Sequence, residues 1–345
     1  MKTTLMKQLA ILLLFFSISG CSPRSSKTTS SYHDNSGRTD IESGGVRMIP
    51  IHTPKGDFKV WTKRTGNNPT IKVLLLHGGP GITHEYFEAC DSYFPGAEIE
   101  YYYYDQLESH YSEKPNDTSL WNIPHFVEEV EQVRVALGLD STNFYLYGNS
   151  WGGILGIEYA LKHQKNLKGL VVANMVASIP HYNKYANEVL APQLPLEVLK
   201  EIREIEANKD YLNPRYGKLL REHYYTAHIL RKPLDEWPDG VNRAFEHINY
   251  PLYLAIQGPS EFGIVGDAML QGWDRSRDLS NIKVPTLVIG AKYDTMDPDY
   301  MEWMSTQLPK GQYLYCANGS HLAMYDDQQV FFDGLIRFLK EVDNI

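Results

Sequence analysis

Short runs of β-forming residues alternate with helix-length segments along most of the chain, from Phe58 to the C-terminus. Two of these runs, 73–76 and 287–289, are continuously apolar, which is typical of parallel strands buried on both faces. Parallel neighbours need a crossover between them, usually a helix. The pattern therefore predicts an α/β fold, with a mostly parallel sheet covered by helices on both faces. The strands are expected at 58–64, 72–76, 99–104, 144–147, 167–173, 286–290 and 312–315, and the main helices at 123–139, 154–163 and 328–342.

The alternation is interrupted between residues 180 and 275. This segment is rich in Pro and aromatic residues, contains helical stretches at 194–206 and 216–230, and has no run typical of a buried strand. We interpret it as a helical cap inserted into the sheet domain, which then consists of residues 48–179 and 276–345. A chain of 345 residues, 43% of them hydrophobic, can bury one such core with an insertion.

The N-terminus has the organisation of a secretory signal. Lys2 and Lys7 precede an apolar run over 9–16, which is far shorter than the roughly 20 residues of a membrane-spanning helix. The sequence ISGC, which ends at Cys21, resembles a bacterial lipobox. This resemblance implies cleavage before Cys21 and lipidation of its thiol.

Residues 22–45 consist mostly of Ser, Thr, Gly and charged residues, a composition typical of a solvated linker. We therefore predict a signal peptide over 1–20, a lipid-anchored flexible tether over 21–47, and a folded domain that starts near Met48. The protein is expected in the bacterial cell envelope as a membrane lipoprotein, on the periplasmic or the outer surface.

The sequence GNSWG at 148–152 fits the pattern G-x-S-x-G and lies between a predicted strand and a predicted helix. In this context the serine occupies a sharp turn with a strained backbone, and small flanking residues let the neighbouring chain approach. The pattern alone is weak, since it arises by chance about once in ten chains of this length. Its position between a strand and a helix makes Ser150 the candidate nucleophile.

A second glycine-rich turn, HGGPG at 77–81, directly follows the predicted buried strand at 72–76. Backbone N–H groups in such a turn can stabilise the oxyanion that forms when a serine attacks a carbonyl. In hydrolases with a G-x-S-x-G turn, one donor is the residue after the nucleophile and the other lies in a loop after an earlier strand. This rule predicts an oxyanion hole formed by Trp151 and Gly79, with Gly78 as the alternative to Gly79.

A serine alcohol needs a base and an orienting carboxylate, which follow it in the order Ser, acid, His in these hydrolases. Asp294 follows the predicted strand at 286–290, and His321 follows the one at 312–315. Both residues thus lie at carboxyl ends of strands, where open α/β sheets place their sites. We predict Asp294 as the orienting acid and His321 as the base. Asp297, the alternative acid, precedes a proline and is expected to cap a helix instead.

Composition and motifs point away from several other classes of function. The chain has 33 Lys and Arg against 42 Asp and Glu, which gives a formal net charge of −9. Nucleic-acid-binding proteins need a positively charged surface, so this charge argues against nucleic acid as a partner. No metal-binding or nucleotide-binding motif is present, so we expect a site without a metal and without a cofactor. Cys90 and Cys316 receive no role: free buried cysteines are favoured, and their pairing is left open.

Taken together, these residues resemble the proline iminopeptidases of the α/β-hydrolase fold, including the archaeal tricorn-interacting aminopeptidase. The similarity extends from about Met48 to the C-terminus. It is carried by HGGPG at 77–81, YDQ at 104–106, GNSWGG at 148–153, GPSEF at 258–262, and the loops of Asp294 and His321. The resemblance implies an α/β-hydrolase fold and a serine peptidase that removes N-terminal residues.

The resemblance also assigns a role in the cap. Members of the family bind the free α-ammonium group of the substrate with glutamates, and Glu261 in GPSEF matches one of them. A carboxylate in a closed, water-poor cleft pairs strongly with an ammonium group. Two departures bear on specificity. A second glutamate often follows the catalytic Asp directly, where this chain has Thr295, and the family's Gly-rich, Arg-containing turn after YDQ is replaced by LESHY at 107–111.

The sequence therefore predicts a serine aminopeptidase that releases N-terminal residues, proline preferentially, from short peptides through an acyl-enzyme. An amino-acid amidase or a carboxylesterase with the same triad is one alternative, motivated by the missing second glutamate. A non-catalytic peptide-binding lipoprotein is the alternative of another class. The expected partners are short peptides or amino-acid amides with a free N-terminus, and the membrane through Cys21.

Overall fold

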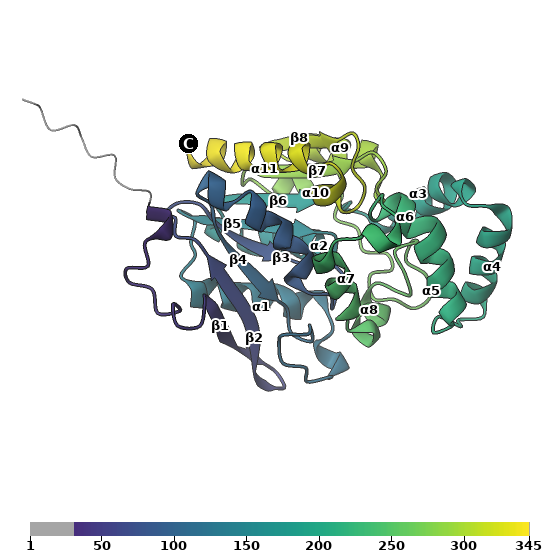
Figure 1. The fold of residues 1–345 in the computed structure, drawn as a ribbon, viewed down its shortest axis with the longest axis horizontal. Helices are drawn as coiled ribbons and strands as arrows, with labels where there is room; N and C mark the ends of the chain where they lie inside the picture. Colours follow the sequence, from purple (N-terminus) through teal and green to yellow (C-terminus); the bar gives the residue numbers. More distant parts are fainter. Residues whose placement is uncertain (1–30, 345) are drawn as a thin grey trace, which may run out of the picture.

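The computed structural model describes residues 31–344 (Figure 1). The signal peptide predicted at 1–20, the predicted lipidation site Cys21 and the first part of the predicted tether lie outside the described residues. Within the described part of the chain, no helix combines the length and the apolar character needed to cross a membrane.

Eight strands form a single sheet in the order β1-β2-β4-β3-β5-β6-β7-β8. The strand β2 pairs antiparallel with β1 and with β4, and the remaining neighbours are parallel. The predicted α/β-hydrolase sheet is thus confirmed. The strands are β1 (Val46–Thr53), β2 (Gly56–Thr65), β3 (Lys72–Leu76), β4 (Glu100–Asp105), β5 (Phe144–Asn149), β6 (Gly169–Ala173), β7 (Thr286–Ala291) and β8 (Gly311–Cys316).

Alternate residues of the central strands pack on opposite faces of the sheet. Leu74 and Leu76 belong to a large apolar cluster on one face, and Val73 and Leu75 belong to a second cluster on the other. Helices complete both clusters, as the continuous apolar runs predicted. The first face is covered by α1 (Ile123–Leu137), α2 (Trp151–His163) and α9 (Pro298–Gln307), and the second by the 3₁₀ segment η2 (His84–Ser92), α10 (Ala323–Asp326) and α11 (Gln328–Asp343).

The register of the parallel strands brings their carboxyl ends to one edge of the sheet. Leu76 at the end of β3 lies opposite Gly148 of β5. Asn149, which ends β5, lies opposite Ala173 of β6, and Ala173 in turn lies opposite Ile289 of β7. The loops that follow these strands therefore start side by side, which is the arrangement that places sites in open α/β sheets.

The elements between β6 and β7 are helical and form the cap. The cap has its own small apolar cluster, which includes Ile202, Leu219 and Tyr224. Figure 1 shows α3, α4, α5 and α6 as a lobe at one end of the molecule, with α7 and α8 closer to the sheet. The helices are α3 (Ile179–Tyr185), α4 (Leu196–Ala207), α5 (Pro214–Leu220), α6 (Thr226–His228), α7 (Asp239–Glu246) and α8 (Tyr250–Ile256), with the π-helical turn η8 (Arg221–Tyr225) between α5 and α6.

Part of the stretch before the expected boundary at Met48 contacts the sheet domain. Tyr32, placed by sequence in the tether, is buried. Asp34 accepts a hydrogen bond through its backbone carbonyl from the Asn67 side chain at 2.9 Å, and Arg38 pairs with Asp40 at 2.8 Å. Within this stretch Tyr32, Asp40 and Gly45 are thus buried, while most of the other residues are exposed.

Both cysteines of the described chain that the sequence left without a role, Cys90 and Cys316, are buried and free. Each lies in the apolar cluster under α11. Burial raises the pKa of the Cys90 thiol well above its usual value. A buried, protonated thiol is a packing group, because nucleophilic cysteines need an accessible thiolate.

Candidate active site

Ser150 occupies the sharp turn between β5 and α2. Its backbone has φ 56° and ψ −125°, a region that non-glycine residues rarely adopt. The turn is closed tightly: a Cβ on Gly148 would lie 2.0 Å from the carbonyl oxygen of Gly152, and a Cβ on Gly152 would lie 2.1 Å from that of Leu76. Only glycine fits at these two positions, and the strained turn presents Ser150 to the cavity described below.

The glycine-rich turn at 77–81 lies beside this serine. The Gly78 N–H donates a hydrogen bond to the hydroxyl of Tyr86 in η2 at 2.7 Å. The Gly79 N–H has no acceptor among the described residues. Trp151 is the first residue of α2, so its N–H has no partner within the helix. Two backbone donors, Gly79 and Trp151, are therefore free to bind an oxyanion, whereas Gly78 is engaged.

Gln106 connects the glycine-rich turn to the serine turn. Its side-chain oxygen accepts from the Trp151 indole at 2.9 Å, and its side-chain nitrogen donates to the His77 carbonyl at 3.2 Å. The neighbouring Asp105 accepts from the backbone N–H of His84 at 2.8 Å. Gln106 of the YDQ sequence thus ties the glycine-rich turn, which carries the free N–H of Gly79, to Trp151.

His321 and Asp294 form a buried hydrogen-bonded pair, with 2.7 Å between Nδ1 and Oδ1. Burial alone lowers the pKa of His321. The charge and hydrogen bond of Asp294, together with the charge of Glu261, outweigh burial and raise the pKa above its usual value. Ser150 and His321 line the same cavity without a direct hydrogen bond. Such bonds commonly tighten only when substrate binds.

Two further side chains contact the Asp294 carboxylate. Asn174 follows β6 and donates to Oδ2 of Asp294 at 2.7 Å. The hydroxyl of Thr295 lies 3.3 Å from Oδ1 of Asp294 and 3.2 Å from Nδ1 of His321. Thr295 is fully buried beside this pair, outside the lining of the cavity. Sequence reasoning missed Asn174, although its position directly after the predicted strand at 167–173 was a usable signal.

Asp297 has the capping role that the sequence predicted. Its side chain accepts from the backbone N–H of Asp299 at 3.0 Å, at the start of α9. It also contacts Nε2 of His181 at 2.7 Å. It makes no hydrogen bond with His321, so Asp294 is the carboxylate that orients the imidazole.

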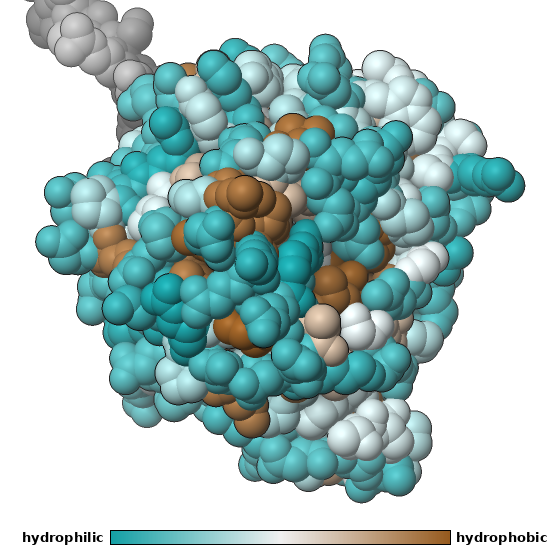
Figure 2. All heavy atoms as spheres, turned by 90° about the vertical axis from the view of Figure 1, so that its right-hand side faces the viewer, coloured by the Kyte–Doolittle hydropathy of each residue, from teal (hydrophilic) through white to brown (hydrophobic). Residues whose placement is uncertain are grey.

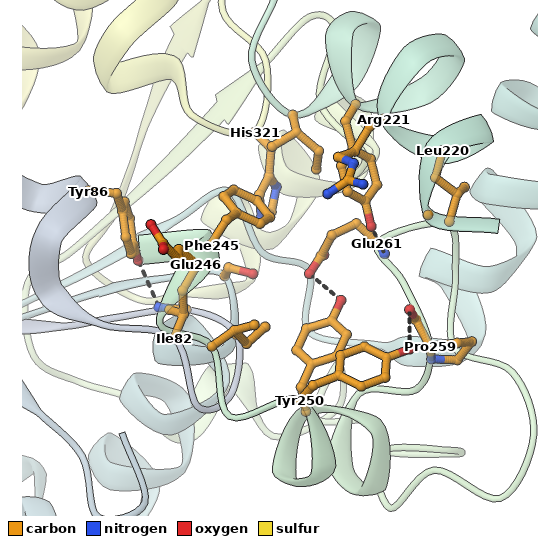
Figure 3. Close-up of a pocket in the computed structure, with 18 of the residues that line it drawn as sticks. Ile82, Tyr86, Leu220, Arg221, Phe245, Glu246, Tyr250, Pro259, Glu261 and His321 are labelled. Atoms are coloured by element: carbon orange, nitrogen blue, oxygen red, sulfur yellow. Dashed lines mark hydrogen bonds between the residues drawn. The ribbon is translucent and has the colours of Figure 1, made fainter. Parts of the chain in front are cut away.

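A cavity of about 710 Å³ lies between the sheet domain and the cap. Ser150, Gly79 and His321 line it from the sheet side, while Glu261 and Tyr250 line it from the cap side (Figure 3). The exposed side chains of the cap that border it include Leu212 and Leu234. Figure 2, a view toward the cap, shows apolar side chains scattered among hydrophilic ones on this face. The cavity can therefore admit a small, partly apolar substrate to Ser150.

Glu261 is the buried carboxylate of this cavity. Its Oε1 accepts from the Tyr253 hydroxyl at 2.6 Å, whereas Oε2 is buried and has no hydrogen-bond partner among the described residues. Burial raises the pKa of Glu261, against the opposing influence of His321 and of the Tyr253 hydrogen bond. A buried polar oxygen without a partner is costly, so this oxygen suits a cationic group of a ligand. Glu246, the other carboxylate that lines the cavity, is exposed.

Comparisons with known proteins agree with this geometry. Residues 72–328 match the family model of the alpha/beta hydrolase fold. A proline iminopeptidase of Elizabethkingia meningoseptica is 61% identical over 296 residues, which cover 86% of this chain and 98% of the relative. A proline iminopeptidase of Chitinophaga pinensis is 59% identical over 297 residues, covering 86% of this chain and 99% of the relative.

Solved structures are similar over the same share of the chain. The crystal structure of VinJ aligns with a TM-score of 0.78 at 28% identity, covering 86% of this chain and 99% of VinJ. The crystal structure of a proline iminopeptidase of Mycobacterium smegmatis aligns with a TM-score of 0.73 at 26% identity, covering 86% of this chain and 98% of that protein.

Proposed function

The chain belongs to the proline iminopeptidase family of α/β hydrolases, and from this premise we propose that it is a serine aminopeptidase that releases N-terminal residues, proline preferentially, from short peptides. One observation carries the proposal. Glu261 lines the same cavity as Ser150, and its Oε2 is buried without a hydrogen-bond partner among the described residues. A substrate that places its N-terminal ammonium on this oxygen presents its first peptide bond to the serine.

In this proposal Ser150 Oγ attacks the carbonyl carbon of the first peptide bond while His321 takes the hydroxyl proton. Asp294 orients the imidazole and stabilises its positive charge. The N–H groups of Gly79 and Trp151 bind the oxyanion of the tetrahedral intermediate. The C–N bond then breaks, and His321 returns the proton to the leaving amine. A water molecule, activated by His321, hydrolyses the acyl-enzyme and frees the N-terminal residue.

Glu261 supplies selectivity for a free N-terminus. An unpaired ammonium in the low-polarity cavity would be costly, and pairing with Glu261 removes that cost. An N-acylated substrate offers no charge and leaves the buried oxygen of Glu261 without a partner. Thr295, which stands where relatives of the predicted type often carry a second glutamate, acts beside Asp294 and His321 instead of binding the amine.

The proposal is tested with arylamides of Pro, Ala, Leu and Phe, each assayed with the wild type and with Ser150→Ala. We expect wild-type hydrolysis, fastest for the Pro substrate, and a loss of at least about 1,000-fold in Ser150→Ala. A fluorophosphonate should label the wild type at Ser150 and leave Ser150→Ala unlabelled. Wild-type protein that is neither labelled nor active would overturn the proposal in favour of a peptide-binding protein.

We further propose that the mature protein is anchored to a bacterial envelope membrane by lipid on Cys21. The support is the lipobox-like ISGC sequence after a short apolar run. Intact mass measurement of the membrane fraction tests it: the expected product begins at Cys21 and carries the mass of attached acyl chains. A Cys21→Ser variant should lose the added mass and leave the membrane fraction. Unmodified Cys21 in the wild type would contradict the anchor.

A further inference from the structure

Tyr86 is a polar group at the nucleophile that the proposed mechanism does not use. It lies in η2, is 3% exposed, and lines the cavity together with Ser150 and Gly79. Its phenolic oxygen accepts the Gly78 N–H at 2.7 Å. The hydroxyl donates to no acceptor among the described residues, so its own proton is available to a ligand.

The position of this hydroxyl is fixed by its surroundings. The Tyr86 ring stacks on Phe87 at 4.4 Å between centroids, and its backbone carbonyl accepts from the Tyr325 hydroxyl at 2.8 Å. A Cβ added to Gly78 would lie 3.0 Å from Cβ of Ser150 and 3.4 Å from the Tyr86 hydroxyl oxygen. The Tyr86 hydroxyl oxygen and Cβ of Ser150 therefore both approach the same side of Gly78. Figure 3 shows the Tyr86 side chain at the edge of the cavity, hydrogen-bonded to the backbone below it.

We propose that Tyr86 is a third donor of the oxyanion hole, which gives its phenolic proton as a hydrogen bond to the oxyanion beside the N–H groups of Gly79 and Trp151. The inference rests on the proposed function. Gly78, whose N–H holds the hydroxyl, is joined to Gly79 by one peptide bond, and Tyr86, Gly79 and Ser150 all line the cavity. The proton stays on the phenol throughout, and no bond other than the hydrogen bond forms.

The local chemistry suits a donor. Burial raises the pKa of the Tyr86 phenol well above its usual value, so the group keeps its proton at the pH where His321 is neutral. A hydrogen bond from a neutral donor to an oxyanion is charge-assisted and stronger than one to the carbonyl of the bound substrate. The hydroxyl therefore stabilises the transition state more than the ground state, which is the condition for raising kcat.

The first test compares Tyr86→Phe with the wild type on a prolyl arylamide. Loss of one oxyanion donor predicts a fall of about 100-fold in kcat with little change in KM. Tyr147→Phe is the matched control: Tyr147 is also fully buried, and its hydroxyl has no partner among the described residues. We expect near wild-type kcat for this control. An unchanged kcat in Tyr86→Phe would overturn the inference. Absence of hydrolysis in the wild type would instead refute the proposed function.

The second test separates donation to the oxyanion from support of the loop. Boroproline forms a tetrahedral adduct with a serine, whereas proline, the product, does not. Tyr86→Phe should weaken boroproline binding by about as much as it lowers kcat, and leave proline binding unchanged. Fluorotyrosine at position 86 makes the hydroxyl a better donor and a poorer acceptor for Gly78. We expect tighter boroproline binding; weaker binding would show that Tyr86 only supports the loop and would overturn the inference.

Discussion

At the scale of single residues, the charges around His321 set the pH range in which it can act as a base. Asp294 and Glu261 both raise its pKa against the effect of burial. A base must be neutral to accept a proton. Because the pKa of His321 is raised above the usual 6.5, we expect activity to fall at a higher pH than it would with an unperturbed histidine. The acid limb of the pH profile is therefore a direct report on these neighbours.

Glu261→Gln should shift this limb to lower pH. The variant removes one negative charge that raises the pKa of His321, so the imidazole stays neutral at more acidic pH. We expect the shift in the pH dependence of kcat/KM for a neutral ester without an amine, which avoids the effect of Glu261 on substrate binding. Glu246→Gln, at the exposed carboxylate of the cavity, should leave the limb in place. A shift of the Glu261→Gln limb to higher pH would contradict this account.

Asp294 and Asp297 differ in role although three residues separate them. Asp294→Asn should lower kcat by about 10⁴-fold, because it loses the charge that stabilises the imidazolium and fixes its tautomer. Asp297→Asn keeps an oxygen that can cap α9, and we expect kcat within about threefold of the wild type and a loss of at most about 1 kcal/mol in unfolding free energy. Kinetics with a prolyl arylamide and urea unfolding check both. A larger loss of kcat in Asp297→Asn than in Asp294→Asn would identify Asp297 as the carboxylate that orients His321.

The parts of the site that sequence could predict are those that follow local rules. The strand-turn-helix context singled out Ser150, and the loops after two predicted strands singled out Asp294 and His321. Contacts across elements could not be predicted, because they depend on how the cap and η2 lie on the sheet. The hydrogen bond of Tyr86 to Gly78, the burial of Thr295 and the contact of Asn174 with Asp294 all belong to this second kind.

At the scale of elements, an ionic network joins the cap helix α7 to η2 of the sheet domain. Glu85 in η2 is fully buried and pairs with Arg243, while its other oxygen accepts from Nδ1 of His247 at 2.7 Å. Arg243 also pairs with Glu88 at 2.5 Å and with the exposed Asp239 at 2.7 Å. The hydrogen bonds of Glu85 outweigh its burial and lower its pKa to about 2.

Glu85→Gln should destabilise the protein by about 3 kcal/mol at pH 7, because it leaves Arg243 and His247 without their buried partner. A carboxylate whose pKa is lowered in the folded state stabilises the fold above its unfolded pKa, and this stabilisation is lost as the pH falls toward its folded pKa. The difference in unfolding free energy between the wild type and Glu85→Gln should therefore shrink as the pH falls from 4.5 toward about 2.

Urea unfolding across this pH range measures the effect, and Asp239→Asn is the matched control. Asp239 pairs with the same arginine but is exposed, so its removal should cost less than about 1 kcal/mol. Two results would contradict the role of the buried pair. One is an equal loss of unfolding free energy in the two variants, and the other is a loss in Glu85→Gln that does not depend on pH.

Elements were predictable where burial was complete and less so at the edges. The central strands gave continuous apolar runs, whereas β1 is an edge strand that contains a proline and only two buried residues, and it was not among the predicted strands. The burial of Tyr32 and Asp40 within the polar stretch 31–45 was not predicted either. The composition of a segment predicts whether most of its residues are buried, but it does not predict the burial of an individual side chain.

At the scale of the whole molecule, the proposed function gives the core and the cap separate roles: the core carries out the hydrolysis and the cap selects a free N-terminus. The core supplies Ser150, His321, Asp294 and the free backbone N–H groups, and the cap supplies Glu261 on the opposite wall of the cavity. Neither part alone selects a free amine next to the scissile bond. In the proposed function, the preference for a free amine therefore requires both parts.

The most direct test of this account compares prolyl arylamide with its N-acetylated form, using the wild type, Glu261→Gln and the control Glu246→Gln. We predict hydrolysis of the free-amine substrate by the wild type, with the N-acetylated form at least about 100-fold slower. Glu261→Gln should reduce this preference by roughly 10- to 100-fold, which corresponds to the free energy of one hydrogen bond to a charged group. Glu246→Gln should keep the wild-type preference. Equal rates of the wild type on both substrates would contradict the account and assign the chain to the amidases or esterases.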